Sequence, residues 1–248
     1  MLDSRVVTML ELFIPAASLP AGAVVAGFST RHGGDEVTSL ARAAGFDPRR
    51  LFALDQVHGA RVVRVERADD PADVATIRAD AMVTTEPGVV LAVKTADCVP
   101  VLLAHRGGSA VAAVHAGWRG LVAHVVGAAV AALSELSGAP PSELVAAVGP
   151  AIGVCCYEVS REVADEVARA AGTADVVQER LPRPHVDLRS AVLARLERTG
   201  IPRDGIEVVG SCTRCRPDMF HSFRHEGPRS GRQLSFVFIR DLDRASAV

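Results

Sequence analysis

The stretch Val111-Ala112-Ala113-Val114-His115-Ala116-Gly117-Trp118-Arg119-Gly120 passes from an apolar run through a glycine turn into an amphipathic run. This order predicts a strand, a turn and the start of a helix. His115 would leave the last strand position, and Arg119 would lie beside glycine amides at a helix N-terminus, a natural place for an anion. We therefore expect the chemistry of the protein at this turn.

Outward from this turn, apolar strand-like runs are the commonest pattern in the chain. They are expected at 24–30, 61–66, 81–85, 89–94, 99–104, 110–115, 144–149, 206–210 and 234–239. Helical spacing of apolar residues predicts helices at 37–54, 118–136, 160–171 and 187–199. Because strands outnumber helices and cluster together, we predict an α+β fold, a single layered domain over residues 1–248 with mixed β-sheets flanked by helices.

Composition narrows the function classes. The 248 residues carry a formal net charge of -2, which lacks the positive field of a general nucleic-acid binder. No apolar stretch reaches the length of a membrane span, and no N-terminal signal is recognisable. We therefore expect a cytoplasmic protein with a small-molecule partner, no nucleic-acid or membrane partner, and five reduced cysteine thiols.

Three single residues at the edges of strand-like segments are candidate metal ligands: His58, Cys98 and His115. Zinc binds imidazole nitrogen and thiolate sulfur, and a catalytic zinc site uses three protein ligands and leaves a fourth position open. Spacing alone also allows each residue to be an ordinary packed or hydrogen-bonded side chain. A third possibility is that Cys98 is a nucleophile activated by His115, although His58 would then be surplus.

Four arginines near presumed strand or helix ends are candidate phosphate ligands: Arg31, Arg119, Arg224 and Arg232. The planar guanidinium suits phosphate or carboxylate, whereas the plain alternative for each is a solvated surface charge. Asp97, beside Cys98, is a candidate for orienting a ligand or moving a proton. It can equally bond a backbone amide at the strand start.

A second cysteine feature is Cys212-Thr213-Arg214-Cys215. Its C-x-x-C spacing could serve a metal or a redox dithiol. The chain has no second C-x-x-C to complete a four-thiolate site, and no thioredoxin-type βαβ unit precedes this one. We therefore expect a structural or incidental role.

Five ordered motifs together resemble one known family. They are Asp55-Gln56-Val57-His58-Gly59, Ala79-Asp80-Ala81-Met82-Val83-Thr84, Thr95-Ala96-Asp97-Cys98-Val99-Pro100, His115-Ala116-Gly117-Trp118-Arg119-Gly120 and Gly149-Pro150-Ala151-Ile152-Gly153. The similarity runs from Phe28-Ser29-Thr30-Arg31-His32-Gly33-Gly34 to Ser222-Phe223-Arg224 with Gly231-Arg232. In this order the segments resemble the laccase-domain family, also called multicopper polyphenol oxidoreductases.

The resemblance implies a layered α/β domain and a zinc ion held by His58, Cys98 and His115. It also implies phosphorolysis of adenosine, inosine, guanosine and methylthioadenosine with inorganic phosphate, and deamination of adenosine in the same pocket. The older family name implies copper-dependent oxidation of phenols. The chain departs from the family at His221 and Phe223, where Phe and Tyr are usual, and this affects the shape of the pocket and the choice of substrate.

The histidine content favours zinc over copper chemistry. A multicopper oxidase needs a blue-copper centre and a trinuclear cluster, and these demand many histidines, commonly in His-x-His pairs. The chain has eight histidines and no His-x-His pair. In a phosphorolytic enzyme, Arg119 with the neighbouring amides, helped by Arg31, would hold phosphate, and in a deaminase zinc would activate water, with Asp97 as the candidate proton carrier. A non-catalytic, metal-stabilised binding module stays open as a further alternative.

Overall fold

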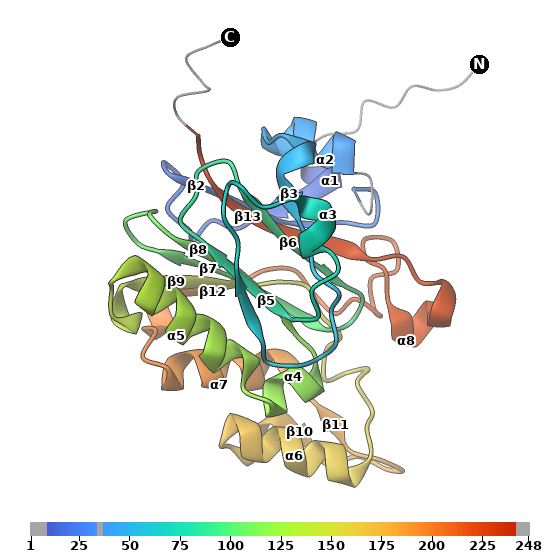
Figure 1. Ribbon diagram of the computed structural model, residues 1–248. Coiled ribbons are helices and arrows are strands. Elements are labelled where there is room, and N and C mark those ends of the chain that lie inside the picture. The colour runs from blue at the N-terminus through green and yellow to red at the C-terminus, as the bar shows by residue number, and fades with distance from the viewer. Residues whose placement is uncertain (1–8, 34–36, 242–248) are drawn as a thin grey trace, which may run out of the picture.

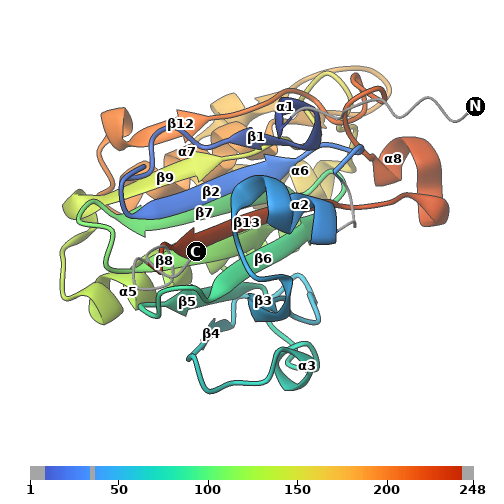
Figure 2. The ribbon, with the colours of Figure 1, turned by 90° about the horizontal axis from the view of Figure 1, so that it is seen from above.

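Two mixed β-sheets lie face to face, with helices on the outer side of each, in the computed structural model of the chain (Figures 1 and 2). The structure describes residues 9–33 and 37–241, so Gly34, the last residue of the segment 28–34 at which the similarity begins, lies outside the described residues. The five-stranded sheet has the order β1 (Phe13–Pro15), β2 (Val24–Ser29), β13 (Gln233–Ile239), β6 (Val90–Thr95) and β3 (Leu51–Phe52). The six-stranded sheet has the order β12 (Ile206–Val208), β9 (Leu144–Val148), β7 (Val99–His105), β8 (Val111–Ala116), β5 (Ala81–Thr84) and β4 (Val62–Arg64).

Both sheets mix parallel and antiparallel pairs, which confirms the predicted layered fold. The parallel pairs are β3 with β6, β4 with β5, and β9 with β12, and the other pairs in the two sheets are antiparallel. Strand β13 pairs with β2 on one side and β6 on the other, so it joins the two ends of the chain in one sheet. A small hairpin-like pair, β10 (Val177–Gln178) with β11 (His185–Val186), lies apart from both sheets.

Helices close the two outer faces. The six-stranded sheet is covered by α4 (Trp118–Val122), α5 (Val125–Ser137) and α7 (Leu188–Arg198), and α6 (Arg161–Ala171) packs against α4 and α7, as Figure 1 shows. The short helices α1 (Met9–Leu12) and α2 (Val37–Ala44) lie over the five-stranded sheet, as the view in Figure 2 shows. Two further single turns are α3 (Pro71–Val74) and α8 (Phe223–Glu226). No helix in the described parts of the chain has the length and apolar character needed to cross a membrane.

Burial on both faces explains why the central strands read as continuous apolar runs. Side chains alternate along a strand, so Ala112 and Val114 of β8 pack toward the helices while Val111 and Ala113 pack between the sheets. Most of these side chains are small, and this keeps the layers close. The central strands are thereby fixed rigidly, and the residues that leave their ends are positioned with them.

Two predicted helices differ from the structure. The segment 37–54 is helical only to Ala44, because Gly45 takes a left-handed conformation (φ 77°) and a capped 3-10 turn, Pro48–Arg50, follows before β3. The segment 118–136 is divided between α4 and α5, because His124 between them takes a left-handed conformation (φ 69°). Histidine is among the residues that tolerate this region best. The break redirects α5 along β5 and β8.

Candidate metal centre and pocket

The pairing of β7 with β8 places Cys98 next to the turn that follows His115. Cys98 directly precedes β7, whose first residue, Val99, lies opposite Ala116 at the end of β8, and Pro100 lies opposite His115. Because the pairing is antiparallel, the beginning of one strand meets the end of the other. Cys98 and His115 are therefore placed together by the central hairpin, although they are distant in sequence.

A buried carboxylate brings His58 to the same place. Asp80, which precedes β5, is fully buried, and its Oδ1 accepts hydrogen bonds from His58 N at 2.9 Å and from His115 Nδ1 at 2.8 Å. Its Oδ2 accepts from Gly59 N at 2.6 Å and from Val57 N at 3.3 Å. These bonds stabilise the left-handed backbone of His58 (φ 60°). One carboxylate thus fixes both histidines.

The three candidate donors converge. One ligand atom each from His58, Cys98 and His115 lies within 4.8 Å of the other two, and Cys98 Sγ is 3.8 Å from His58 Nε2. The two imidazole rings meet edge to face, with 4.8 Å between their centroids. Gly117 is required beside them, because a Cβ at this position would lie 2.7 Å from His58 Cδ2 and 3.0 Å from Cys98 Sγ.

The protonation states of this cluster are strongly coupled. Burial alone would raise the pKa of the Cys98 thiol, but the neighbouring His115 and His58 outweigh it and lower that pKa to about 6. Burial alone would lower the pKa of His115, but Asp80 and Cys98 outweigh it and raise that pKa to about 9. Without a metal the chain therefore favours a thiolate beside an imidazolium, a negatively charged sulfur ready to bind a cation.

The donor set fits a mononuclear metal ion. A tetrahedral zinc ion with bonds of about 2.0–2.3 Å needs neighbouring nitrogen and sulfur ligands about 3.5 Å apart, close to the distance between Cys98 and His58. Asp80 occupies Nδ1 of His115, so Nε2 is left for an ion, the arrangement in which a carboxylate orients a metal-binding histidine. Among the described residues, the other group of metal-ligating side chains contains no histidine.

The cluster lies at a cavity of about 580 Å³, within the size range of small-molecule sites. Three aromatic side chains and four cationic side chains line it: Trp118, Tyr157, Phe223, Lys94, Arg119, Arg224 and Arg232. Burial and the nearby Cys98 raise the pKa of Tyr157 to about 12, so its phenol keeps its proton at neutral pH. Thr95 also lines the cavity, and its buried hydroxyl has no hydrogen-bond partner in the described structure.

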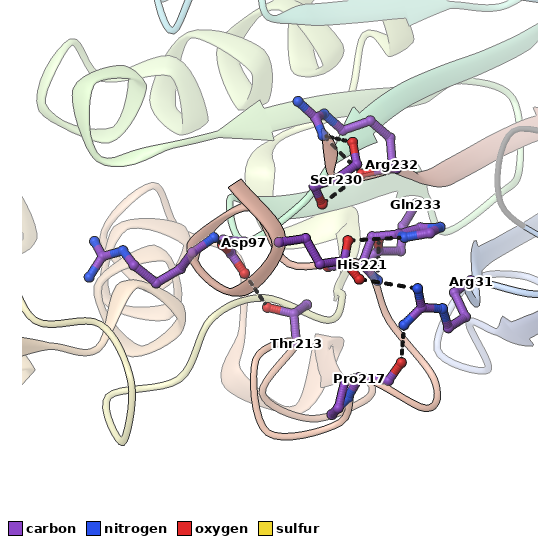
Figure 3. A network of polar contacts seen from close by, with 11 residues as sticks. Arg31, Asp97, Thr213, Pro217, His221, Ser230, Arg232 and Gln233 are labelled. Carbon is purple, nitrogen blue, oxygen red and sulfur yellow. Dashed lines mark hydrogen bonds and ion pairs between the residues drawn. The ribbon is translucent and has the colours of Figure 1, made fainter. Parts of the chain in front are cut away.

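The predicted arginines divide into two groups. Arg119, Arg224 and Arg232 line the cavity, and each stacks on an aromatic ring, with Arg119 4.4 Å above Trp118. Arg31 is not among the lining residues. Its guanidinium pairs with Glu226 at 3.1 Å. Figure 3 shows that it also donates to the carbonyl of Pro217. Arg119 lies, as predicted, in the first turn of a helix: α4 follows the end of β8 directly, has Gly117 at its N-cap without a side-chain cap, and is five residues long.

Asp97 is engaged by the protein itself. Its Oδ1 accepts from Thr213 Oγ1 at 2.6 Å, and its Oδ2 accepts from the backbone N of Arg224 at 2.7 Å (Figure 3). Its backbone is left-handed (φ 89°), and its carbonyl accepts from Ile152 N at 3.0 Å. Asp97 lies at the cavity wall and orients the turn that carries Cys98.

Residue patterns singled out neither Asp80 nor Tyr157 as a functional residue. The position of Asp80 offered a signal, because an acid directly before a buried apolar strand needs hydrogen-bond partners if it is buried with that strand. Tyr157, the one tyrosine of the chain, follows the Cys155-Cys156 pair and offered no pattern of its own. Of the two positions where the sequence was expected to depart from the family pattern, Phe223 lines the cavity. His221 is not among the lining residues, and its Nδ1 lies 3.5 Å from Glu226 Oε2.

Fold and pocket together define a class of protein: a mixed α/β scaffold whose metal-ligating side chains converge beside a small-molecule cavity. A family model described as multi-copper polyphenol oxidoreductase laccase matches residues 26–240, so the chain belongs to this family.

Proteins of similar sequence carry the names of enzymes of purine nucleoside metabolism. A purine nucleoside phosphorylase of Streptomyces coelicolor is 44% identical and covers 80% of this chain and 79% of its own. The adenosine deaminase RL5 of an unknown prokaryotic organism is 34% identical, covering 82% and 80%. The crystal structure of YlmD from Geobacillus stearothermophilus matches with a TM-score of 0.83 at 29% identity, covering 93% of this chain and 99% of its own. These names support an enzyme of purine nucleoside metabolism.

Proposed function

We propose that this protein is a zinc-dependent purine nucleoside phosphorylase that acts on adenosine, inosine, guanosine and methylthioadenosine and also deaminates adenosine. The observation that carries the proposal is the joint placement of His58, Cys98 and His115 beside a cavity walled by aromatic rings and arginines. Relatives named for both activities support it. We also propose that residues 1–248 act as one domain, because β13 pairs with both β2 and β6.

The cavity wall offers groups for both substrates of a phosphorolysis reaction, the phosphate and the purine nucleoside. Phosphate oxygen attacks the anomeric carbon of the ribose, the bond from that carbon to the base nitrogen breaks, and the base leaves with the bonding electrons and takes up a proton. Arg119, Arg224 and Arg232 would hold and align the phosphate, since guanidinium groups bind its oxygens in pairs. Trp118 and Tyr157 offer faces on which a purine can stack.

Polar groups of the wall would orient the nucleoside. The unpartnered hydroxyl of Thr95 is available to a sugar or base, and the phenol of Tyr157 can donate because it keeps its proton. Asp97 would act as a positioning residue that holds the Cys98 turn through Thr213 and Arg224. Arg31 would anchor α8 through Glu226, and α8 carries two residues of the wall.

His58, Cys98 and His115 would hold the zinc ion, and when bound the ion would supply Lewis-acid chemistry at an open fourth position. Asp80 would keep both imidazoles oriented toward it. All five cysteines are free, and free thiols persist in a reducing compartment, which favours a cytoplasmic location.

A direct assay tests the proposal. Purified, zinc-loaded protein with inosine and phosphate should release hypoxanthine and ribose 1-phosphate, and with adenosine it should also release ammonia. Arg119→Gln should raise the KM for phosphate at least tenfold, whereas the matched control Arg49→Gln, at an exposed surface pair with Asp47, should not. Zinc-loaded protein that consumes no nucleoside, or full activity in metal-free Cys98→Ala, contradicts the proposal.

Copper-dependent phenol oxidation is the second candidate, favoured by the family description and by a two-histidine, one-cysteine donor set. It predicts several tightly bound copper ions per chain and oxidation of phenols that tracks copper content. A trinuclear cluster needs further histidines close together, and the described residues contain no second group of metal-ligating side chains that includes histidine. Zinc without copper in the isolated protein would exclude this candidate.

A further inference from the structure

A second group of metal-ligating side chains lies outside the pocket. Cys155, Cys156, Cys212 and Cys215 each offer a sulfur, and all four sulfurs lie within 4.8 Å of one another. None of the four lines the cavity. The adjacent pair Cys155-Cys156 supplies the two thiols that a second C-x-x-C would have provided. With Cys212 and Cys215 it completes a set of four sulfur ligands.

Two loops are joined at this group by backbone contacts. Ala151 and Cys212 form a parallel bridge, and Thr213 N donates to Ala151 O at 3.1 Å. The 153–157 turn is closed by bonds from Cys156 N and Tyr157 N to Gly153 O. The backbone thus places the two cysteine pairs against each other independently of any sulfur chemistry.

The distances between sulfurs match ligands of one ion. Cys215 Sγ lies 3.5 Å from Cys155 Sγ and 3.4 Å from Cys156 Sγ, and no pair is joined as a disulfide. A tetrahedral zinc ion with four bonds of about 2.3 Å would hold its sulfurs about 3.8 Å apart. Small shifts of side chains reach that geometry.

One thiol is already prepared as a ligand. Gly153 N donates to Cys212 Sγ at 3.2 Å. An amide N–H that donates to sulfur favours the thiolate over the thiol, and the thiolate is the form that binds a metal. Four thiols at such distances repel one another once ionised, and a divalent cation removes that repulsion.

We propose that Cys155, Cys156, Cys212 and Cys215 bind a second metal ion, a zinc ion in a closed four-thiolate site. Four protein ligands leave no position for water or substrate, so the ion would be structural. This inference concerns metal binding and stability, and it stands apart from the reaction proposed for the pocket.

The four-cysteine site would stabilise one wall of the pocket. Tyr157 follows Cys156 directly and lines the cavity. Thr213 follows Cys212 directly and holds Asp97, the residue before Cys98, with a hydrogen bond of 2.6 Å. An ion that clips the two loops together therefore fixes one wall of the cavity and the turn that carries a ligand of the other ion.

Metal analysis and cobalt substitution of the full chain test the proposal. The protein, prepared under reducing conditions and reconstituted with Co²⁺, should bind about two ions per chain. The matched variants Cys98→Ser and Cys215→Ser should each retain about one ion, but with different spectra. Cys98→Ser should keep the intense sulfur-to-cobalt charge-transfer band of a four-thiolate site, whereas Cys215→Ser should lose most of it.

The outcomes are decisive even if Cys215→Ser fails to fold, because wild type and Cys98→Ser suffice. One ion in wild type and none in Cys98→Ser would overturn the proposal. So would a disulfide between two of the four cysteines in protein alkylated without reductant. Failure of the nucleoside assay would leave this result untouched, because the readout is bound metal and its spectrum.

Discussion

Replacement of Asp80 by asparagine tests whether one buried carboxylate organises the pocket. The substitution keeps the size of the side chain and removes its charge. Oδ1 bonds to His58 N and His115 Nδ1, and Oδ2 bonds to Gly59 N and Val57 N. Asparagine can keep one oxygen, but its NH2 must then face two backbone N–H donors.

The magnitude follows from the bonds lost. A buried donor without a partner costs about 1–3 kcal/mol. Gly59 N at 2.6 Å would lose a strong bond and Val57 N at 3.3 Å a weak one, so we expect a loss of about 3 kcal/mol in the metal-free protein. Removing the carboxylate that orients a metal-binding histidine typically lowers metal affinity about 10–100-fold, or about 1.4–2.8 kcal/mol.

Acid pH should erase part of this difference. Burial would raise the pKa of Asp80, but hydrogen bonds from His115, Gly59 and His58 outweigh it and lower that pKa. A lowered pKa stabilises the fold at pH above the unfolded value of about 4, and this stability is lost as pH falls through the folded value. Wild type and Asp80→Asn should therefore converge in stability on acidification.

Urea unfolding of metal-free protein and competitive zinc titration measure the two effects. Asp55→Asn is the matched control, because Asp55 is an exposed acid of the loop that carries His58, and its carboxylate makes a 4.0 Å surface pair with Arg78. It should change stability by less than about 0.5 kcal/mol. A folded Asp80→Asn protein that binds zinc as tightly as wild type would refute the orienting role.

Three further predictions address the turn, the thiol and the rim of the pocket. Gly117→Ala should weaken zinc binding at least tenfold because its Cβ meets His58 and Cys98, whereas Gly22→Ala, with open space around it, should not; zinc titration compares them. In metal-free protein, alkylation of Cys98 should rise with pH and reach half its maximum near pH 6, below an ordinary thiol, and zinc should block it; mass spectrometry of the labelled peptide reports this. Arg31→Gln should remove the anchor of α8 at Glu226 and raise the KM for nucleoside several-fold with metal content unchanged; an unaltered KM would show that α8 holds without it.

Sequence periodicity predicted the strands well because the central ones are buried on both faces. Runs such as 99–104 and 110–115 contain almost only apolar residues, and their short length between turn residues favours strands covered on both faces. The helices at 37–54 and 118–136 were predicted too long. Their apolar spacing continues through Gly45 and His124, and only the left-handed backbone at those residues ends the helix.

The metal donors were found from the sequence, but their organiser was not. His58, Cys98 and His115 have side chains that few roles explain, so residue type alone selected them. Asp80 acts through distances to three backbone amides and a ring nitrogen, and only strand register, with Ala81 opposite Val114, creates those distances. Likewise, nothing in the spacing from Cys156 to Cys212 indicates that the two cysteine pairs meet.

The three-donor group and the four-cysteine group differ in number of ligands, and this difference indicates different roles. The first has three donors beside a cavity, so an ion there keeps a position for a small molecule. The second has four sulfurs, none of which lines that cavity, so an ion there would have its coordination filled by protein. The two groups are linked by a short path. Cys212 is followed in the chain by Thr213, Thr213 donates a hydrogen bond to Asp97, and Asp97 is followed by Cys98. Because the coupling between two binding sites is reciprocal, loss of either ion should weaken binding of the other by the same factor.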